Sequence, residues 1–474
     1  MLFPFLFWGF FMRQYCMLCL VACFCVFNAA LLEASEELPN FVVILSDDQS
    51  WVGSSVLMDP SNPETRSDYL RTPQMERMSR MGMRFTQGYA PAPYCCPTRR
   101  SLVVGQTPAR HVYQKDQPGW AKSFRESLSL PRMLKLADPS YRTAHFGKWD
   151  SRFDNVTPEQ MGYDVSDGLT GNGTGGGKGD KDAGASDDPK LVGSLTKRVE
   201  DFIEGHAKSG QPFFVQVSHY AVHLDIFYRN STLKRTRQWK PGRRHSLPKF
   251  AAMTSDVDQA VGQLLDHIDS LGLLGNTYIF FMSDNGGRLT MPGQNRGVLP
   301  RNYPLHEGKG SMYEGGLRVP FMVIGPGIEA GTTSRVPVTG LDVFPTIAEF
   351  AGFDGVLPEV LDGGSMVSVL RGAGQGKVQR SHPFLVFHQA GAREAQSALR
   401  QGDYKIVKHW AANRVELFNL ADDLSEHRDL AAQYQQKCDE MEQSLDQFLE
   451  DVGALTERNT TKAGQRAMFS KSAP

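Results

Sequence analysis

Cysteine is scarce outside the N-terminal segment. Four of the seven cysteines lie before residue 26, and the rest of the chain keeps Cys95, Cys96 and Cys438. Adjacent cysteines rarely bridge each other, because such a disulfide would be strained. The chain is therefore not a disulfide scaffold, and the Cys95-Cys96 pair needs a chemical explanation.

An excess of charge of either sign is also missing. The formal net charge is -1 over 474 residues, with 22% charged and 41% hydrophobic residues. This balance is ordinary for a soluble globular protein and gives no reason to expect a nucleic-acid partner or a membrane-surface protein. The length suffices for one large domain or two smaller ones.

The N-terminus is almost free of charge. Arg13 is the only cation of residues 1–32, and an apolar run follows it up to Leu32. A basic start, an apolar stretch and a polar boundary predict a secretory signal over residues 1–35, with Met12 as an alternative start. The rival reading is a retained membrane anchor, since the segment is long enough to span a bilayer. Cleavage would give an exported protein, periplasmic or extracellular, without stable membrane association.

Short apolar runs alternate with helical patterns along most of the chain. Helical spacing of apolar residues appears within 191–203 and 250–268, and Asp188 and Pro189 suit the start of the first helix. Buried strands are expected at 41–45, 212–217, 278–282 and 319–324. This alternation predicts an α/β fold, with a large, mostly parallel sheet flanked by helices.

The character of the chain changes after about residue 375. Short strands are expected at 398–400, 404–408 and 415–420, and a closing helix at 430–449. We therefore expect a main domain over 36–375, a smaller α+β subdomain with an antiparallel sheet over 376–455, and a flexible tail over 456–474. Glycine-rich residues 171–187 have no periodicity and predict a flexible surface loop.

Two of the expected strands run into acidic pairs. Asp47-Asp48 follows the first strand, and Asp284-Asn285 follows the strand at 278–282. Sites form beyond the carboxyl ends of strands in open α/β sheets, and an all-oxygen set suits a hard divalent cation such as Ca²⁺ or Mg²⁺ rather than zinc. The alternative is that each pair only caps a turn.

A dense motif surrounds the cysteine pair: Pro93-Tyr94-Cys95-Cys96-Pro97-Thr98-Arg99, followed by an apolar segment and Gly105. Cys-x-Pro-Thr-Arg resembles the signature of the formylglycine-dependent sulfatases of the alkaline phosphatase superfamily. The positions of Pro97 and Arg99 select Cys95 rather than Cys96 as the modified residue.

The resemblance implies a fold, a nucleophile and a metal. It implies the alkaline-phosphatase-like sandwich, and formylglycine made from Cys95, whose hydrate attacks the sulfate ester and gives a sulfo-enzyme intermediate. Arg99 would hold the modified side chain. One Ca²⁺ would be bound by Asp47, Asp48, Asp284, Asn285 and the modified Cys95.

Further motifs match the family in the same order. Lys148 in Gly-Lys-Trp and Lys309 in Glu-Gly-Lys-Gly resemble the sulfate-binding lysines, and His223 the histidine on the leaving-group side. Fixed positive groups suit a transferring sulfuryl group, and imidazole can protonate a leaving oxygen. Where the family has histidine after Gly-Lys-Trp, this chain has Asp150, a candidate base for turnover.

The substrate is less defined by the sequence. A sulfated carbohydrate is the expected substrate, and a formylglycine-generating maturation enzyme the expected partner. Seven cations and no acid lie between Arg229 and Arg244; they form either a positive rim for an anionic glycan or a solvated, flexible loop. A phosphoesterase of the same superfamily and an inactive glycan-binding homologue remain the alternative functions.

Overall fold

The computed structural model describes residues 37–111, 120–150, 155–176, 184–293, 299–390 and 395–456. The leader expected over 1–35, almost all of the expected tail and the middle of the loop expected over 171–187 lie outside these ranges. Among the described residues, no helix combines the length and the apolar character needed to cross a bilayer.

A large mixed sheet forms the centre of the fold. In spatial order its strands are Thr332–Ser334 (β11), Met83–Phe85 (β2), Phe321–Ile324 (β10), Thr277–Ser283 (β9), Asn40–Ser46 (β1), Phe213–Ser218 (β7), Arg142–Gly147 (β4) and Val165–Ser166 (β5). β9, β1, β7, β4 and β5 run parallel, whereas β10 is antiparallel to β9 and β2. The mostly parallel sheet predicted from the sequence is confirmed.

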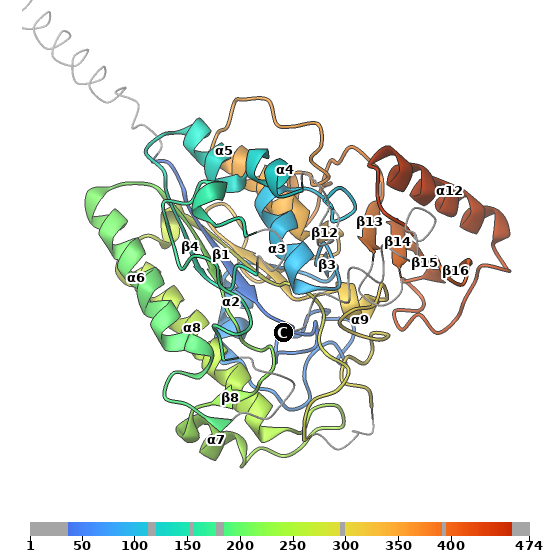
Figure 1. Ribbon diagram of the computed structural model, residues 1–474. Coiled ribbons are helices and arrows are strands. Elements are labelled where there is room, and N and C mark those ends of the chain that lie inside the picture. The colour runs from blue at the N-terminus through green and yellow to red at the C-terminus, as the bar shows by residue number, and fades with distance from the viewer. Residues whose placement is uncertain are drawn as a thin grey trace, which may run out of the picture. The chain divides into compact units, whose positions relative to one another are not determined.

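Helices cover both faces of this sheet (Figure 1). On one face lie Pro73–Met81 (α2), Val192–Ser209 (α6) and Pro248–Ser270 (α8), packed on side chains such as Ile44 and Phe281. Cys95–Val104 (α3), Leu130–Ala137 (α5) and Val343–Phe350 (α10) contact one another on the other face, where Phe350 stacks on Tyr278 of β9 at 3.8 Å. The apolar runs of the central strands are buried because both faces are covered.

Shorter elements connect these layers. The helices are Trp120–Glu126 (α4), Asn230–Thr236 (α7), Glu314–Leu317 (α9) and Val367–Arg371 (α11), with 3-10 turns at Glu159–Met161, Pro189–Leu191, Leu274–Asn276 and Gly340–Asp342. Two small parallel pairs join Gly88–Tyr89 (β3) to Val338–Thr339 (β12) and Gly184–Ala185 (β6) to Phe227–Tyr228 (β8).

A separate antiparallel sheet follows the main one. It contains Leu385–Gln389 (β13), Gln396–Gln401 (β14), Tyr404–His409 (β15) and Arg414–Asn419 (β16). Its apolar face, with Leu399, Ile406 and Leu417, packs on Leu445 and Phe448 of the closing helix, Gln435–Asp451 (α12). The antiparallel C-terminal sheet is confirmed, but the helix begins at Gln435 rather than at 430, because residues 430–434 form a turn.

Three local features differ in detail from what the sequence suggests. The helix expected from Pro189 begins at Val192, since Lys190 and Leu191 have positive φ values of 56° each; the Asp188 carboxylate still accepts the Gly193 amide at 2.6 Å. The expected loop 171–187 ends in β6, which pairs with β8. The basic segment 229–244 is not a flexible loop throughout, because α7 occupies part of it and the buried Arg244 donates to the carbonyls of Glu64, Arg66 and Tyr303.

Candidate active site

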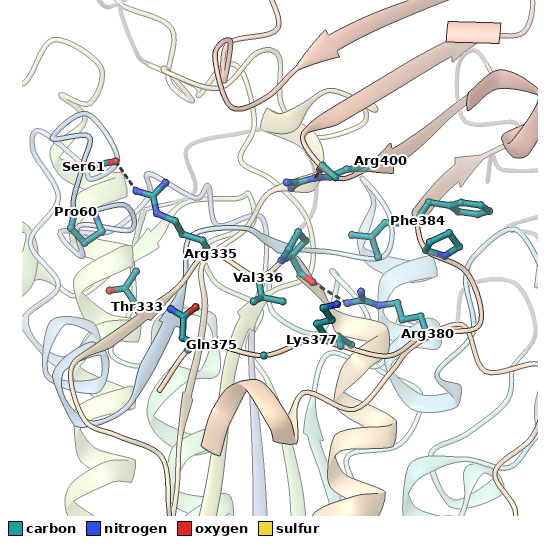
Figure 2. A pocket seen from close by; sticks show the side chains of 17 residues that line it. Pro60, Ser61, Thr333, Arg335, Val336, Gln375, Lys377, Arg380, Phe384 and Arg400 are labelled. Atoms are coloured by element: carbon teal, nitrogen blue, oxygen red, sulfur yellow. Dashed lines mark hydrogen bonds between the residues drawn. The ribbon is translucent and has the colours of Figure 1, made fainter. Parts of the chain in front are cut away.

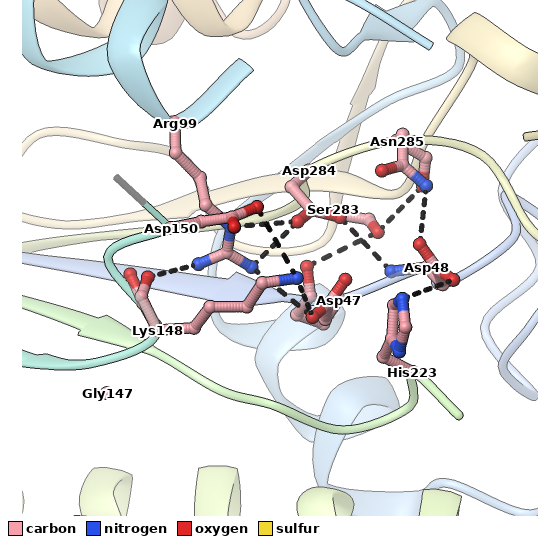
Figure 3. A network of polar contacts seen from close by, with 12 residues as sticks. Asp47, Asp48, Arg99, Gly147, Lys148, Asp150, His223, Ser283, Asp284 and Asn285 are labelled. Carbon is pink, nitrogen blue, oxygen red and sulfur yellow. Dashed lines mark hydrogen bonds and ion pairs between the residues drawn. The ribbon is translucent and has the colours of Figure 1, made fainter. Parts of the chain in front are cut away.

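The two acidic pairs meet at the carboxyl ends of neighbouring strands. β1 and β9 are parallel, with Ser46 opposite Ser283, so Asp47-Asp48 and Asp284-Asn285 leave the sheet side by side. All four side chains are buried. The Asp48 amide donates to Asp284 Oδ1 at 3.1 Å, and Asn285 Nδ2 donates to Asp48 Oδ1 at 2.8 Å. The strand register therefore places these four residues in one cluster (Figure 3).

Three oxygens of this cluster can receive a cation. Asp47 Oδ1, Asp48 Oδ2 and Asn285 Oδ1 are buried and accept no hydrogen bond from the part of the chain that the structure describes. Buried carboxylate and amide oxygens are strongly disfavoured without a partner. A hard divalent cation with a preference for oxygen ligands fits this donor set.

His223 joins the cluster from the loop after β7. Its Nε2 lies 3.7 Å from Asp48 Oδ2, and its ligand atom, together with those of Asp47 and Asp48, forms a group within 4.8 Å. Reciprocal hydrogen bonds between Asp47 and the Ala221-Val222 backbone, 3.0 and 2.8 Å long, hold this loop on β1. The imidazole is an addition to the oxygen set expected from the sequence, and burial lowers the pKa of His223.

Lys148 enters the cluster from the end of β4. Its ammonium donates to Asp47 Oδ2 at 2.7 Å and is fully buried. A Cβ on the preceding Gly147, which has a φ of 95°, would lie 2.1 Å from the Ser218 carbonyl oxygen of β7. Glycine therefore allows β4 to end against β7 and to present Lys148 to the acids.

Lys309 joins the cluster from the loop that follows β9. The Lys309 amide donates to the Gly287 carbonyl at 2.9 Å, and Asn302 Nδ2 donates to the same carbonyl and to that of Glu307. This bracing fixes the loop to the end of β9, and the Lys309 ammonium pairs with Asp48 Oδ1. Burial opposes the charge of either lysine, but Asp47 raises the pKa of Lys148 and Asp48 raises the pKa of Lys309, so both side chains are cations at neutral pH.

Cys95 is the first residue of the ten-residue helix α3. The three cysteines of the described chain form no disulfide, and all are buried. Burial, reinforced by the negative charge of Asp150, raises the pKa of Cys95 to about 11. The unmodified sulfur is therefore a neutral thiol at neutral pH and a poor nucleophile.

Arg99 connects the helix to the ends of two strands. Its Nε and Nη2 donate to Asp284 Oδ2 at 3.0 and 2.7 Å, and its Nη1 donates to the Lys148 carbonyl at 2.7 Å. The guanidinium is buried, so these charge-assisted bonds are shielded from water. Arg99 therefore links α3 to the residues that follow β4 and β9.

Asp150 lies two residues after Lys148 and has a left-handed backbone conformation, with a φ of 63°. Its amide donates to the Thr170 carbonyl at 2.8 Å, and its Oδ2 lies 3.8 Å from Lys148 Nζ. The carboxylate is buried, and its charge acts on Cys95. Asp150, which stands where the family motif has histidine, therefore lies in the same site as Cys95.

One buried cation near the site was not anticipated. Lys190 is buried, its Nζ lies 5.5 Å from the centre of the Phe227 ring, and it interacts electrostatically with Asp47 and Asp225. Burial lowers its pKa to about 8. The sequence signal was misleading, because Asp188-Pro189 resembles a simple helix start while the following positive-φ pair forms a turn.

Two side chains of the cluster remain partly exposed. The acidic residues, Arg99, Lys148 and Asp150 are almost completely buried, whereas Lys309 and His223 keep 12% and 13% of their side chains exposed. Among these described side chains, Lys309 and His223 are therefore the two that a ligand in solution can contact.

Comparisons with known proteins identify the family of this chain. The family model described as Sulfatase matches residues 39–353, and that described as N-sulphoglucosamine sulphohydrolase, C-terminal, matches residues 306–454. A protein named sulfatase from Formosa agariphila is 26% identical, covering 84% of this chain and 85% of its own length. N-acetylgalactosamine-6-sulfatase of Mus musculus is 27% identical over 69% of this chain, which spans 65% of the mouse enzyme.

Solved structures share the fold. The crystal structure of Ps i-CgsB in complex with k-i-k-neocarrahexaose superposes with a TM-score of 0.71 at 22% identity, covering 92% of this chain and 98% of that one. The fold, the converging motifs and the family match over most of the chain lead to one assignment. The chain belongs to the sulfatase family, whose members are sulfuric ester hydrolases.

Proposed function

We propose that this protein hydrolyses sulfate esters of a carbohydrate, with a formylglycine made from Cys95 as nucleophile. The observation that carries the proposal is the position of Cys95, buried at the start of α3 among Lys148, Lys309 and Asp150. The neutral state of the thiol argues against direct attack by cysteine, and favours conversion of this side chain by a maturation enzyme before the protein acts.

A calcium ion fits the acidic cluster. Asp47, Asp48, Asp284 and Asn285 would hold it, together with the modified side chain at position 95, and the ion would supply positive charge beside the sulfate. Support comes from the three buried oxygens that accept no hydrogen bond within the described chain. Asp284 is less available as a calcium ligand, because both of its oxygens already accept hydrogen bonds, from the Asp48 amide and from Arg99.

The cations of the site bind and orient the sulfate. Lys148 pairs with Asp47, Lys309 pairs with Asp48, and Arg99 pairs with Asp284. Negative charge that develops on sulfate oxygens in the transition state is stabilised by such fixed positive groups, because they need no reorganisation. Their burial excludes water and strengthens this interaction.

His223 is proposed to protonate the leaving sugar oxygen. Its side chain lies beside Asp48 and remains 13% exposed, so it can face the carbohydrate part of a bound substrate. Asp150 is proposed as the base that takes up a proton beside position 95 when sulfate is released, in place of the family histidine. Its burial and its electrostatic contact with Cys95 support this role.

Carbohydrate is the favoured substrate class. The mouse relative is named N-acetylgalactosamine-6-sulfatase, and the aligned crystal structure is a complex with k-i-k-neocarrahexaose. A protein with the predicted leader would meet such polymers after export. Sulfated mono- and oligosaccharides are therefore the first substrates to test.

The test is sulfate release from a panel of sulfated sugars by protein co-expressed with a formylglycine-generating enzyme. Cys95→Ala should abolish release, whereas Cys96→Ala, at the neighbouring buried cysteine, should retain it. Loss of activity in Cys96→Ala alone would contradict the assigned register. Phosphate release without sulfate release would identify a phosphoesterase instead, and no release from protein carrying the aldehyde at position 95 would contradict the carbohydrate sulfate assignment for the panel tested.

A further inference from the structure

A cavity of about 930 Å³ opens between the β11 edge of the main sheet and the C-terminal sheet (Figure 2). Its lining comes from β11, segments 335–337 and 374–378, the approach to β13, and Arg400 of β14. No candidate catalytic residue lines it. Ligand pockets commonly measure about 300–1,000 Å³, so a short oligosaccharide would fit.

The lining of this β11 cavity is basic. It contains Arg335, Lys377, Arg380 and Arg400, and none of its lining residues is acidic. Arg335 is 67% exposed and lies 3.4 Å from Asp59 Oδ1. The Lys377 side chain is exposed and makes no hydrogen bond or ion pair with any residue in the described ranges. Asp59 and Asp342 pair with Arg335 and Arg380, so the excess of positive charge in the cavity comes from Lys377 and Arg400.

Two of the four cations are held in place. The Arg400 guanidinium donates to the Gly402 carbonyl at 3.1 Å and also to Tyr89 and Gln87. Arg380 donates to Asp342 and, at 3.0 Å, to the Pro337 carbonyl. Binding to such fixed groups loses little side-chain entropy.

An apolar wall lies beside the charges. Phe384 stacks on His382 with ring centroids 5.1 Å apart and meets the edge of Phe448 at 6.1 Å. Val336 and Pro383 extend this surface. A few charged groups beside a fixed apolar surface match a ligand that has both anionic substituents and hydrophobic C–H faces, as a sulfated sugar has.

We propose that the β11 cavity is a second binding site for a sulfated segment of a glycan, outside the catalytic site. The inference takes its ligand class from the proposed function and concerns binding only. A second binding site raises the effective concentration of a long glycan at the enzyme. The β11 cavity should therefore strengthen the binding of sulfated polymers and have no effect on sulfated monosaccharides.

The probe is dextran sulfate, with unsulfated dextran as its reference. Binding is measured with the inactive Cys95→Ala protein, with and without the added pair Arg335→Glu and Lys377→Glu. We expect about tenfold weaker binding of dextran sulfate by the doubly reversed protein, because two exposed charge contacts become repulsive. In the otherwise wild-type enzyme, the same pair should raise KM for a sulfated polymer and leave turnover of a sulfated monosaccharide unchanged.

A matched control carries Lys122→Glu and Lys208→Glu, two lysines that are each 72% exposed on α4 and α6. Unchanged binding in the Arg335/Lys377 protein, equal loss in the control, or equal binding of unsulfated dextran would each overturn the inference. Cavity-dependent dextran sulfate binding in a protein that cleaves no sulfate ester would instead refute the proposed function and leave this site standing.

Discussion

At the scale of single residues, Asp150 is the position at which this chain departs from the sulfatase pattern. Its left-handed backbone is one that Asp, Asn and His adopt more readily than other side chains. It is buried, it lies near the Lys148 ammonium, and its charge reaches Cys95. These surroundings suit a carboxylate that takes up a proton inside the site.

Replacing Asp150 by Asn should therefore slow sulfate release about 100-fold while the backbone conformation is kept. Asp150→His, which restores the family residue, should retain most of the activity. Rapid-quench measurements should show the desulfated sugar appearing before free sulfate in the Asn variant. Sulfate release at the wild-type rate by Asp150→Asn would show that another group is the base.

Calcium should stabilise the folded protein through the acidic cluster. At a free calcium concentration of about 100 times Kd, the free energy of unfolding should rise by about 2.7 kcal/mol, because the ion binds only the folded chain. Asp47→Asn should remove this response, measured as the urea midpoint with calcium and with chelator.

Asp258→Asn is the control for this effect. Asp258 is also a buried carboxylate, but it accepts the Gln74 and Met75 amides at the start of α2. This variant should lose stability yet keep the calcium response. A calcium response that survives Asp47→Asn would place the ion elsewhere.

Site residues that lie in a recognisable sequence motif could be predicted from the sequence, whereas a site residue outside such a motif could not. The acidic pairs follow apolar strands, and Cys95 with Arg99 lies in a signature with fixed spacing. Lys190 has no such context. It reaches the site because two consecutive positive-φ residues turn the chain before α6, and a positive φ at lysine or leucine has no reliable sequence signal.

At the scale of elements, the ends of the parallel strands decide where the proposed catalytic groups lie. Gly147 ends β4 with its Cα against the Ser218 carbonyl of β7, one residue before Lys148. Gly147→Ala should reduce the free energy of unfolding by at least about 1–3 kcal/mol, because of its φ and this contact. It should also lower kcat by displacing Lys148.

Gly168→Ala separates the effect of the positive φ from the effect of the close contact with Ser218. Gly168 also has a positive φ, 74°, but a Cβ there would meet nothing within 4 Å. This control should show a smaller loss of stability and nearly normal kcat. Equal effects of the two substitutions on kcat would contradict a specific role for the β4–β7 contact.

Strands with continuous apolar runs were predicted, whereas the mixed-composition strands β4 and β13 were not. β1 and β9 are buried on both faces and read as strands from their sequence. β4 contains Arg142, Thr143 and His145, and its pairing with β7 depends on tertiary contacts. β13 was missed for the same reason, since His388 and Gln389 interrupt a short apolar run and become buried only in the sheet.

At the scale of the whole molecule, a buried ionic network joins the main sheet region to the C-terminal sheet. Lys405 of β15 donates to Glu314 of α9 at 2.9 Å and to Glu426 at 2.8 Å. Glu314 also pairs with Arg318, and its amide donates to Glu426 at 2.6 Å. Because α9 follows the loop that carries Lys309, this network connects the C-terminal sheet to the site.

Lys405→Met should destabilise the protein by about 3–5 kcal/mol, because two buried carboxylates would lose their shared cation. Lys408→Met on the same strand is the control, since Lys408 pairs with the partly exposed Glu442 and Asp446 inside the C-terminal unit. Urea unfolding should show the larger loss for Lys405→Met. A loss no greater than that of the control would contradict a connecting role for this network.

The most direct measurement of the central claim is the mass of the Cys95 peptide compared with activity in the same preparations. Protein made with increasing amounts of a maturation enzyme should contain increasing fractions of the aldehyde at position 95. The account predicts that the rate of sulfate release is proportional to this fraction and is zero when the thiol is intact. Sulfate release from protein whose Cys95 is entirely unmodified would contradict it.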